Sequence, residues 1–455
     1  MMLYYSTNRV AQPIPFPEAL LQGQAPDRGL YMPETIPCLT RQEIAAFSDM
    51  EYHQIAARVM GSYLREELPP AVLEELARDA YNFDVPLEHV ADRHYVMRLD
   101  QGPTASFKDF AARMMGRLIN HYLQEQDRRL IILTATSGDT GSAISHAFLG
   151  LDRIRVVVLF PIREVTNRQR KQMTTLGQNI RVVAIDGKFD DCQALVKEAF
   201  ADPDLEYLPL SSANSINIGR LIPQTVYYFW AYSRLAKDGE KITFAVPSGN
   251  FGDMMGGILA MKMGLPVNKF VIAVNENDGF PRYLDGGHYQ KIEPSRNCIS
   301  SAMNVGHPSN LARLVALYGG QMDERGVIHR PADMDAMRRD IFTASITDEE
   351  TRNTIREAWE KHGLLLEPHG AVGWAGLQHY LRTAAGDAEN PLCVALETAH
   401  PAKFPEEINQ LLNFDPDLPQ SLQGLEDKKE HFENIDNNYP TFKIFLMTKF
   451  WFTRD

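Results

Sequence analysis

Six short apolar segments, separated by helical patterns, constrain the fold of this chain more than any other feature of its sequence. They lie at Leu130–Thr134, Arg155–Phe160, Ile180–Ile185, Ile242–Val246, Phe270–Val274 and Leu392–Leu396. Their residues are mostly apolar and β-branched without interruption, which is typical of parallel strands covered on both faces. Helical segments such as Asn167–Leu176 and Cys192–Phe200 stand between them. This alternation predicts an α/β fold with parallel sheets.

The part of the chain before these segments has a helical pattern. Apolar side chains recur at helical spacing over His53–Glu66 and again over Ala71–Tyr81, which a Pro-Pro pair introduces at the favoured entry position. A strand-like stretch begins near Tyr95, and a further helix is predicted over Phe107–Leu123. With roughly 150 residues to a domain, the 455 residues of the chain suggest two or three domains.

The charge of the chain limits its partners. There are 46 Lys and Arg residues against 59 Asp and Glu residues, which gives a net charge of −13. A surface of that sign repels a phosphate backbone, so we expect no nucleic acid partner. A small anionic substrate is still compatible with the charge, because a local cationic pocket can lie inside an acidic protein.

Cysteine spacing and hydropathy indicate the compartment. Cys38, Cys192, Cys298 and Cys393 lie far apart without a CxxC pair, which argues against a disulfide framework and against a zinc site. No apolar stretch approaches the roughly 18 residues of a membrane helix, and the N-terminus lacks the pattern of a signal peptide. We therefore expect a soluble cytoplasmic protein without a metal centre.

The first segment that indicates chemistry is GPTASFKDF, residues 102–110. Ser106, with Asp109 three residues later, predicts a capping-box start of a helix, which puts Lys108 in the first turn. The helix dipole disfavours an ammonium there, and burial lowers the pKa of a lysine in the same direction. A lysine so placed can be neutral near pH 7 and form an imine with an aldehyde. Taken alone, the spacing more often indicates a surface lysine on an amphipathic helix.

The second segment is PSGNFGDMMGG, residues 247–257, which follows a strand and opens a helix. Gly249 and Gly252 allow the backbone to approach an anion, and the amides at the helix start point toward it. The segment is neither a P-loop nor a GxGxxG sequence, so it favours a phosphate site without favouring ATP or a dinucleotide. We expect Asp253 to be the helix N-cap, since phosphate repels a carboxylate. A tight turn without a ligand is the alternative interpretation.

The third segment is ATSGDTGSA, residues 135–143, again between a strand and a helix. Its hydroxyl groups belong to Thr136, Ser137 and Thr140. Hydroxyls and amides in a glycine-rich turn suit a carboxylate or a phosphate. Arg220, in SANSINIGR, is either an anion clamp or a solvated helical arginine. His369 in EPHGA and His400 in ETAHPAKF lack metal-ligand spacing, so we interpret both as structural.

Taken in order, GPTASFKDF, TSGDTG, SANSIN, PSGNFGD, EPHGA and TAHPAKF make the chain resemble the threonine synthases. DRGLYMPE, residues 27–34, resembles the N-terminal domain of the longer form, so the likeness covers nearly the whole chain. It implies a pyridoxal 5′-phosphate (PLP) enzyme of fold type II, the tryptophan synthase β-subunit type, with the cofactor in a cleft between two α/β domains. The domains would be a mainly helical N-terminal one (1–92), a large one (93–119 and 213–455) and a small one (120–212).

The resemblance also assigns roles to single residues. Lys108 matches the lysine that carries PLP, and Thr398 matches the residue that hydrogen-bonds the pyridine nitrogen. The loop for the cofactor phosphate would be Gly249, Asn250, Phe251, Gly252 and Asp253. The residues for the substrate would be Thr136, Ser137, Gly138, Asp139, Thr140, Gly141 and Arg220. The wider fold type usually has an asparagine that donates to the phenolic oxygen of PLP where this chain has Asp139. An ionised aspartate cannot donate, so Asp139 is protonated, bridged by water or a loop-shaping residue.

The implied reaction converts O-phospho-L-homoserine and water to L-threonine and phosphate, the last step of threonine biosynthesis. PLP would act as the electron sink, while Lys108 removes a proton from Cα and then one from Cβ. Phosphate leaves from Cγ, and water adds at Cβ. The alternatives are a related PLP-dependent phospholyase, a serine or threonine dehydratase and, from another class, a non-catalytic ligand-binding scaffold. The long form of the family further implies a monomer.

Overall fold

The computed structural model describes residues 2–64, 66–136, 138–383 and 390–449, and its largest sheet has six strands in the order β14-β11-β10-β15-β5-β4. These strands are β4 (Leu87–Ala91), β5 (His94–Arg98), β10 (Ile242–Pro247), β11 (Val267–Val274), β14 (Ile341–Ser345) and β15 (Cys393–Glu397). Neighbouring strands are parallel, apart from the antiparallel pair β4 and β5. Three of the predicted apolar segments form β11, β10 and β15 in the middle of this large sheet.

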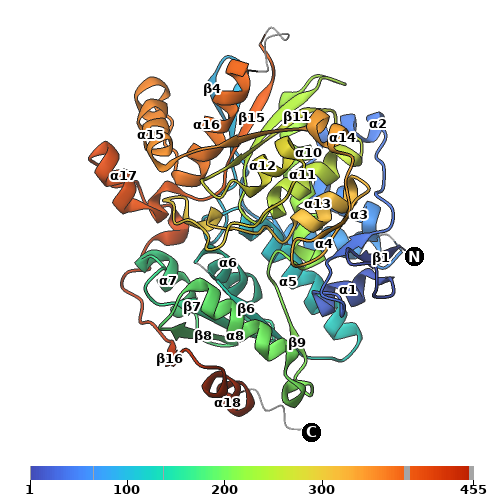
Figure 1. Cartoon of the computed structure of the whole chain (residues 1–455), viewed down its shortest axis with the longest axis vertical. Coiled ribbons are helices and arrows are strands. Elements are labelled where there is room, and N and C mark those ends of the chain that lie inside the picture. Colours follow the sequence, from blue (N-terminus) through green and yellow to red (C-terminus); the bar gives the residue numbers. More distant parts are fainter. Residues whose placement is uncertain (1, 65, 137, 384–389, 450–455) are drawn as a thin grey trace.

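A second, small sheet has five parallel strands in the order β16-β8-β7-β6-β9. They are β6 (Leu130–Ala135), β7 (Ile154–Pro161), β8 (Ile180–Ile185), β9 (Leu210–Ser211) and β16 (Glu433–Ile435). The other three predicted segments are β6, β7 and β8. The predicted α/β fold with two parallel or mixed sheets is therefore confirmed, and Figure 1 shows the small sheet below the large one.

Helices cover both sheets. Those beside the small sheet are α6 (Asp139–Phe148), α7 (Asn167–Thr174), α8 (Phe189–Ala201) and α18 (Tyr439–Lys449). The helices that follow β9 and precede β16 are α9 (Ile218–Leu221), α10 (Val226–Leu235), α11 (Gly252–Lys262), α12 (Gly279–Gly286), α13 (Leu311–Leu317), α14 (Met334–Asp340), α15 (Asp348–His362), α16 (Pro368–Thr383) and α17 (Pro405–Leu412). The long helix α5 (Lys108–Glu125) packs against α6 on one side and α9 on the other, so it connects the two regions.

Among the described residues, the N-terminal region contains four α-helices and a small antiparallel sheet. The helices are α1 (Phe16–Gln22), α2 (Arg41–Ala45), α3 (Tyr52–Leu64) and α4 (Pro70–Ala80). The sheet has the order β2-β1-β3, with β1 (Leu3–Ser6), β2 (Ile14–Pro15) and β3 (Tyr31–Pro33). A separate hairpin in the large domain consists of β12 (Gln321–Met322) and β13 (Ile328–Arg330). Within the described residues, no helix is long and apolar enough to cross a membrane.

Two of the predicted domain limits need correction. β4 lies before residue 92, but it pairs with β5 and so belongs to the large sheet. The C-terminal segment was assigned to the large domain, yet β16 pairs with β8 at the edge of the small sheet. Figure 1 shows the segment after α17 running down one side of the molecule to β16 and α18. It ends there because the aromatic side chains of α18 complete the apolar cluster between α8 and the small sheet.

The docking of α18 predicts a measurable contribution to stability. Phe442 is completely buried in the cluster, whereas Ile444 on the same helix is 61% exposed. We expect Phe442→Ala to lower the free energy of unfolding by about 3 kcal/mol, because it leaves a cavity. Ile444→Ala is the matched control and should change it by less than about 0.5 kcal/mol. Chemical denaturation followed by circular dichroism measures both, and equal effects would contradict the docking.

Candidate active site

Backbone hydrogen bonds bring two of the sequence motifs side by side. Ser106 forms an isolated antiparallel bridge with Ala399. On either side of it, the amide of Phe107 donates to the Thr398 carbonyl at 2.9 Å, and the amide of His400 donates to the carbonyl of Ala105 at 3.0 Å. GPTASFKDF and ETAHPAKF are therefore paired, and this pairing places Lys108 next to Thr398.

The start of α5 differs from the predicted capping box. The helix begins at Lys108, its N-cap is Phe107, and no side chain caps it. The carboxylate of Asp109 instead accepts hydrogen bonds from the amide of Thr104 at 2.8 Å and from its hydroxyl at 2.7 Å. A Cβ at Gly102 would lie 2.4 Å from Asp109 Oδ2, so the preceding turn needs a glycine there. The predicted cap is wrong because the carboxylate of Asp109 is hydrogen-bonded to Thr104 in the turn before the helix and not to the first amides of the helix.

Lys108 is mostly buried, which overturns the interpretation as a surface lysine. Its side chain is 13% exposed, and its Nζ lies 3.4 Å from Asp139 Oδ2. Burial lowers the pKa of Lys108, the carboxylate of Asp139 raises it, and the positive charges of Lys403 and Arg220 lower it. The first position of an 18-residue helix disfavours an ammonium further. The site therefore favours loss of a proton from this amine, as reaction with an aldehyde requires.

The segment between β10 and α11 forms a tightly packed loop. Phe251 is the N-cap of α11 and has a left-handed backbone with φ of 64°. A Cβ at Gly249 would lie 2.8 Å from the carbonyl oxygen of Ala302. The side chain of Asn250 donates to Ser215 Oγ at 2.6 Å and accepts from the amide of Ser309 at 2.5 Å. These contacts fix the loop at the N-terminus of α11, a position that attracts an anion.

Asp253 does not cap α11 as predicted. It is the second residue of the helix, and its Oδ1 accepts hydrogen bonds from the hydroxyls of Tyr227 at 2.6 Å and Tyr228 at 2.7 Å. Its Oδ2 is buried and has no hydrogen-bond partner in the described part of the chain. Burial raises the pKa of Asp253 to about 6, against the opposing effect of the two tyrosines. Asp253 therefore ties the loop to α10 rather than ending the helix.

The loop between β6 and α6 is organised around one hydroxyl group. Thr136 Oγ1 accepts hydrogen bonds from the amides of Gly138 at 3.0 Å and Gly141 at 2.7 Å. These two amides are directed into the loop rather than toward a ligand. Thr140 is partly exposed, and Ser137 lies outside the described residues. The loop brings Asp139, the first residue of α6, to Lys108.

Asp139 contacts two residues that the sequence interpretation did not single out. Lys403, at the end of the short turn η5 (Pro401–Lys403), is completely buried with its Nζ 2.6 Å from Asp139 Oδ1. Gln169, in α7, donates from Nε2 to the same oxygen at 2.9 Å. Burial would raise the pKa of Asp139, but the charges of Lys403 and Lys108 outweigh it and hold the pKa well below its usual range. Of the three predicted alternatives, these contacts favour an ionised Asp139 over the protonated form.

Arg220 is a buried cation without a carboxylate on its guanidinium among the described contacts. It is 4% exposed, and its Nη1 donates to the carbonyl of Ala213 at 2.9 Å. Its buried Nε has no hydrogen-bond partner within the described residues. Burial lowers the pKa of Arg220 to about 10. The solvated interpretation is wrong, and the unpaired donor suits an anion.

The two histidines of the motifs have structural partners. His369 Nδ1 lies 2.5 Å from Glu367 Oε2, and its Nε2 accepts from the amide of Ala302 at 3.0 Å. This contact supports the turn that packs against Gly249. The Nδ1 of His400 accepts from the amide of Ala402 at 3.1 Å. Among the residues that the structure describes, no three His, Cys, Asp or Glu side chains gather in a way that could hold a metal ion.

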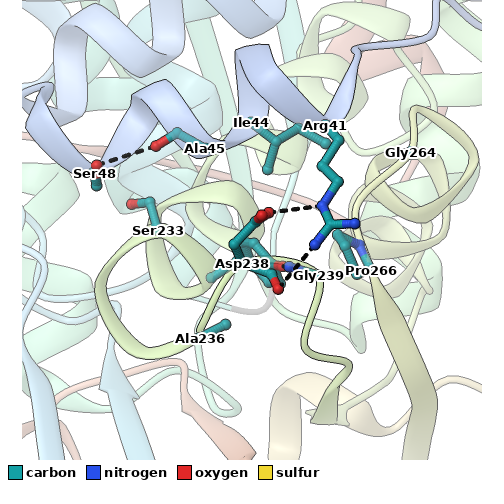
Figure 2. Close-up of a pocket in the computed structure, with 11 residues that line it drawn as sticks. Arg41, Ile44, Ala45, Ser48, Ser233, Ala236, Asp238, Gly239, Gly264 and Pro266 are labelled. Carbon is teal, nitrogen blue, oxygen red and sulfur yellow. Dashed lines mark hydrogen bonds and ion pairs between the residues drawn. The ribbon is translucent and has the colours of Figure 1, made fainter.

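A surface pocket elsewhere on the molecule contains none of these residues. It has a volume of about 470 Å³ and lies between α2, α10 and the turn before β11 (Figure 2). Arg41 reaches across it to Asp238 in an ion pair of 2.8 Å, and the two side chains are 68% and 64% exposed. An exposed ion pair of this kind contributes little to stability, and the motif residues that indicate chemistry lie elsewhere, in the buried cluster around Lys108.

Family models match almost the whole chain. The model described as pyridoxal-phosphate dependent enzyme covers residues 84–396. The model described as threonine synthase N terminus covers residues 3–81, and the one described as threonine synthase, C-terminal covers residues 370–445.

Known proteins resemble the chain over its full length. The threonine synthase of Haemophilus influenzae is 37% identical over 448 residues, which is 98% of this chain and 100% of that protein. The crystal structure of PLP-bound threonine synthase from Brucella melitensis has a TM-score of 0.91 at 35% identity, covering 98% of this chain and 99% of the other. Threonine synthase from Escherichia coli has a TM-score of 0.87 at 36% identity with the same coverage. The resemblance indicated by the motifs is confirmed.

The residues around Lys108 fit pyridoxal phosphate. The amine of Lys108 is buried in a position that favours its neutral form, as an aldehyde requires. The loop at Gly249 lies at the start of an 11-residue helix, whose N-terminus attracts a phosphate, and its backbone packs too closely against Ala302 for any side chain there. Arg220 and Lys403 add positive charge around Lys108. An aldehyde that carries a phosphate matches both the amine and the loop.

The packing at Gly249 predicts how the loop responds to substitution. In Gly249→Ala the new methyl group meets backbone atoms of Ala302 and Met303 within 2.9 Å, so the loop must shift. We expect PLP to bind about tenfold more weakly, for a packing cost of about 1.4 kcal/mol. Gly286→Ala is the matched control, since a Cβ there has nothing within 4 Å. Titration of the apoenzyme with PLP by absorbance measures both, and unchanged affinity in Gly249→Ala would contradict the expectation.

Proposed function

The chain belongs to the threonine synthase family, and from this premise we propose that it converts O-phospho-L-homoserine and water to L-threonine and phosphate. It is a PLP-dependent lyase. The observation that carries the proposal is the burial of Lys108 beside Asp139 of one strand-to-helix loop, close enough to Asp253 of the other loop for the two charges to interact. One loop suits the cofactor phosphate, and the other suits the substrate.

Each group of residues then has a role toward the cofactor. Lys108 is the amine that carries PLP, and the residues Gly249 to Asp253 hold its phosphate. Thr398 lies beside Lys108 through the backbone bond to Phe107 and hydrogen-bonds the pyridine nitrogen. Bound PLP supplies an electron sink for breaking the bonds of the substrate.

Lys108 is also the group that moves protons. When it is not bonded to the cofactor, Lys108 Nζ would be a free base beside the substrate. It would take a proton from Cα of the substrate, release that proton, and only then take one from Cβ, and the electron pair left at Cβ would let phosphate leave from Cγ. The neighbouring carboxylate of Asp139 stabilises the protonated form of Lys108 that results, because it lies 3.4 Å from the same nitrogen.

The substrate carries a carboxylate and a phosphate, and the site offers a group for each. The loop from Thr136 to Gly141 binds the carboxylate at the N-terminus of α6, through groups other than the amides of Gly138 and Gly141, which are bonded to Thr136. Arg220 binds the phosphate, since its Nε is buried and unpaired among the described residues. Retention of the released phosphate near Cβ would then assist the addition of water. The two extra threonine synthase regions matched at either end of the chain favour this reaction over that of a dehydratase.

The cellular context is also part of the proposal. Cys192, Cys298 and Cys393 are buried free thiols and Cys38 is an exposed one, which suits a reducing compartment. We therefore place the enzyme in the cytoplasm, where it acts as a monomer. Its domains are an N-terminal region to about residue 86, a large domain, and a small domain that includes the C-terminal segment from β16 onward.

The reaction is tested by incubating the holoenzyme with O-phospho-L-homoserine and measuring threonine and phosphate together. We expect equal amounts of both, and 2-oxobutyrate in place of threonine would indicate a phospholyase. Lys108→Ala should lower the rate by at least about a hundredfold, because a proton-transfer group is lost. Borohydride should fix the cofactor on Lys108 in the wild type. Lys361→Ala, on an exposed lysine, is the control. Threonine formation by Lys108→Ala at the wild-type rate would refute the assignment.

The role of Arg220 is tested by separating substrate affinity from cofactor affinity. We expect Arg220→Gln to raise the KM for O-phospho-L-homoserine by about tenfold or more, because a charge-assisted hydrogen bond contributes about 1.5–3 kcal/mol. PLP affinity should change far less. Arg220→Lys retains the charge without the planar fork and should be intermediate. Weaker PLP binding with an unchanged KM would place Arg220 at the cofactor phosphate instead.

A further inference from the structure

Lys403 is a buried charge that the proposed reaction does not use. Its side chain is completely buried, and its Nζ contacts Asp139 Oδ1 at 2.6 Å and the carbonyl of Thr104 at 2.9 Å. An ammonium in such surroundings is costly unless it is paired and hydrogen-bonded. Here both conditions are met, and the partner is the carboxylate that faces the cofactor lysine.

The two oxygens of Asp139 have different partners. Oδ1 accepts from Lys403 and from Gln169 Nε2, which lies 2.9 Å away. Oδ2 faces Lys108 Nζ at 3.4 Å. The carboxylate of Asp139 therefore lies between the amines of two lysines, and Lys403 and Gln169 fix its orientation from the side away from Lys108.

The charges act on Lys108 in opposite directions. Asp139 raises the pKa of Lys108, whereas Lys403 lowers it. A buried carboxylate at 3.4 Å without its counter-charge would hold Lys108 as an ammonium, because Coulomb interactions are strong where water is excluded. An ammonium can neither form the bond to an aldehyde nor take a proton from the substrate.

We propose that Lys403 is a positioning residue that offsets the charge of Asp139 and so lets Lys108 release its proton. Asp139 stabilises Lys108 in its protonated form after each proton transfer. Lys403 limits that stabilisation, so that Lys108 can give up the proton again. The pair acts as one unit, in which Lys403 works through Asp139 and touches neither substrate nor cofactor. The proposal rests on the proposed role of Lys108 as the lysine that carries PLP.

Other charged groups near Asp139, Lys403 and Lys108 limit the pH range in which the effect of Lys403 on Lys108 can be measured. Lys108 also faces Arg220 from α9 and Asp253 from α11. Burial raises the pKa of Asp253 to about 6, so its charge is constant only above pH 7. Lys403 further faces Asp109 of α5, His146 of α6 and His400. Burial lowers the pKa of both histidines, so they are neutral in this range.

The experiment follows the visible absorbance of the imine on Lys108 as the holoenzyme is titrated upward from pH 7. Lys403→Met removes the charge and keeps much of the side-chain volume. In Lys403→Met we expect the midpoint of the absorbance titration to move to higher pH by about one unit or more, because the negative charge of Asp139 is no longer offset. Asp139→Asn should move the midpoint downward, and the double variant Asp139→Asn/Lys403→Met should return it close to the wild-type value. The kcat–pH profile should shift in the same directions.

A purely structural role for Lys403 would give a different result. If Lys403 only supports the packing, Lys403→Met lowers thermal stability and leaves the midpoint of the absorbance titration unchanged. That outcome overturns the proposal, and so does a shift of the midpoint to lower pH in Lys403→Met. If Lys403→Met does not fold, Asp139→Asn is compared with the double variant, whose midpoint must be the higher of the two. The matched control is Lys443→Met, which removes a lysine of α18 that is paired with Asp202 and Asp204. It should leave the midpoint of the absorbance titration unchanged.

Failure of this proposal can be told apart from failure of the proposed function. If borohydride does not fix the cofactor on Lys108 in the wild type, the role of Lys108 itself is wrong. If the cofactor is fixed there and the midpoints do not move in opposite directions, only the role of Lys403 is wrong.

Discussion

The buried ion pair between Asp139 and Lys403 is the contact on which the rest of the site depends. Asp139 begins α6 beside the small sheet, and Lys403 ends η5 in a segment paired with the start of α5. Breaking a buried pair leaves an uncompensated charge, which typically costs about 3–5 kcal/mol. The pair therefore joins the two α/β regions at the point where Lys108 lies, and it fixes the orientation of the carboxylate that faces this lysine.

The charges inside the site differ in sign from those of the whole chain. The net charge of −13 excluded nucleic acid as an expected partner, but it gave no information on the ligand. Lys108 and Lys403 both contact the carboxylate of Asp139, and Arg220 adds a further positive charge near Lys108, so this part of the interior favours anions. Such a cluster is stable because water is largely excluded and each charge has a hydrogen-bond partner or a proposed ligand.

Sequence patterns predicted the strands whose side chains are mostly buried on both faces of a sheet. β6, β7, β8, β10, β11 and β15 are buried on both faces, and this gives a continuous apolar segment that can be read directly. β14 and β16 were not predicted, because they are edge strands with exposed positions or only three residues.

The motifs indicated Lys108 and the loop at Gly249. They did not reveal Lys403, whose partner lies far away in the sequence. The capping predictions for Asp109 and Asp253 were wrong because Thr104 and two tyrosines are better-placed partners.

The distance between Lys108 and Asp139 is itself a consequence of helix packing. Lys108 begins α5 and Asp139 begins α6, and the two helices pack together along their length. Gly116 allows this approach, since a Cβ there would lie 2.9 Å from the carbonyl oxygen of Ala147. A larger residue would push α6 outward and lengthen the 3.4 Å separation of Asp139 from Lys108. Coulomb energy falls with distance, so the proton affinity of Lys108 is set by a glycine two turns along the helix as well as by the charges beside it.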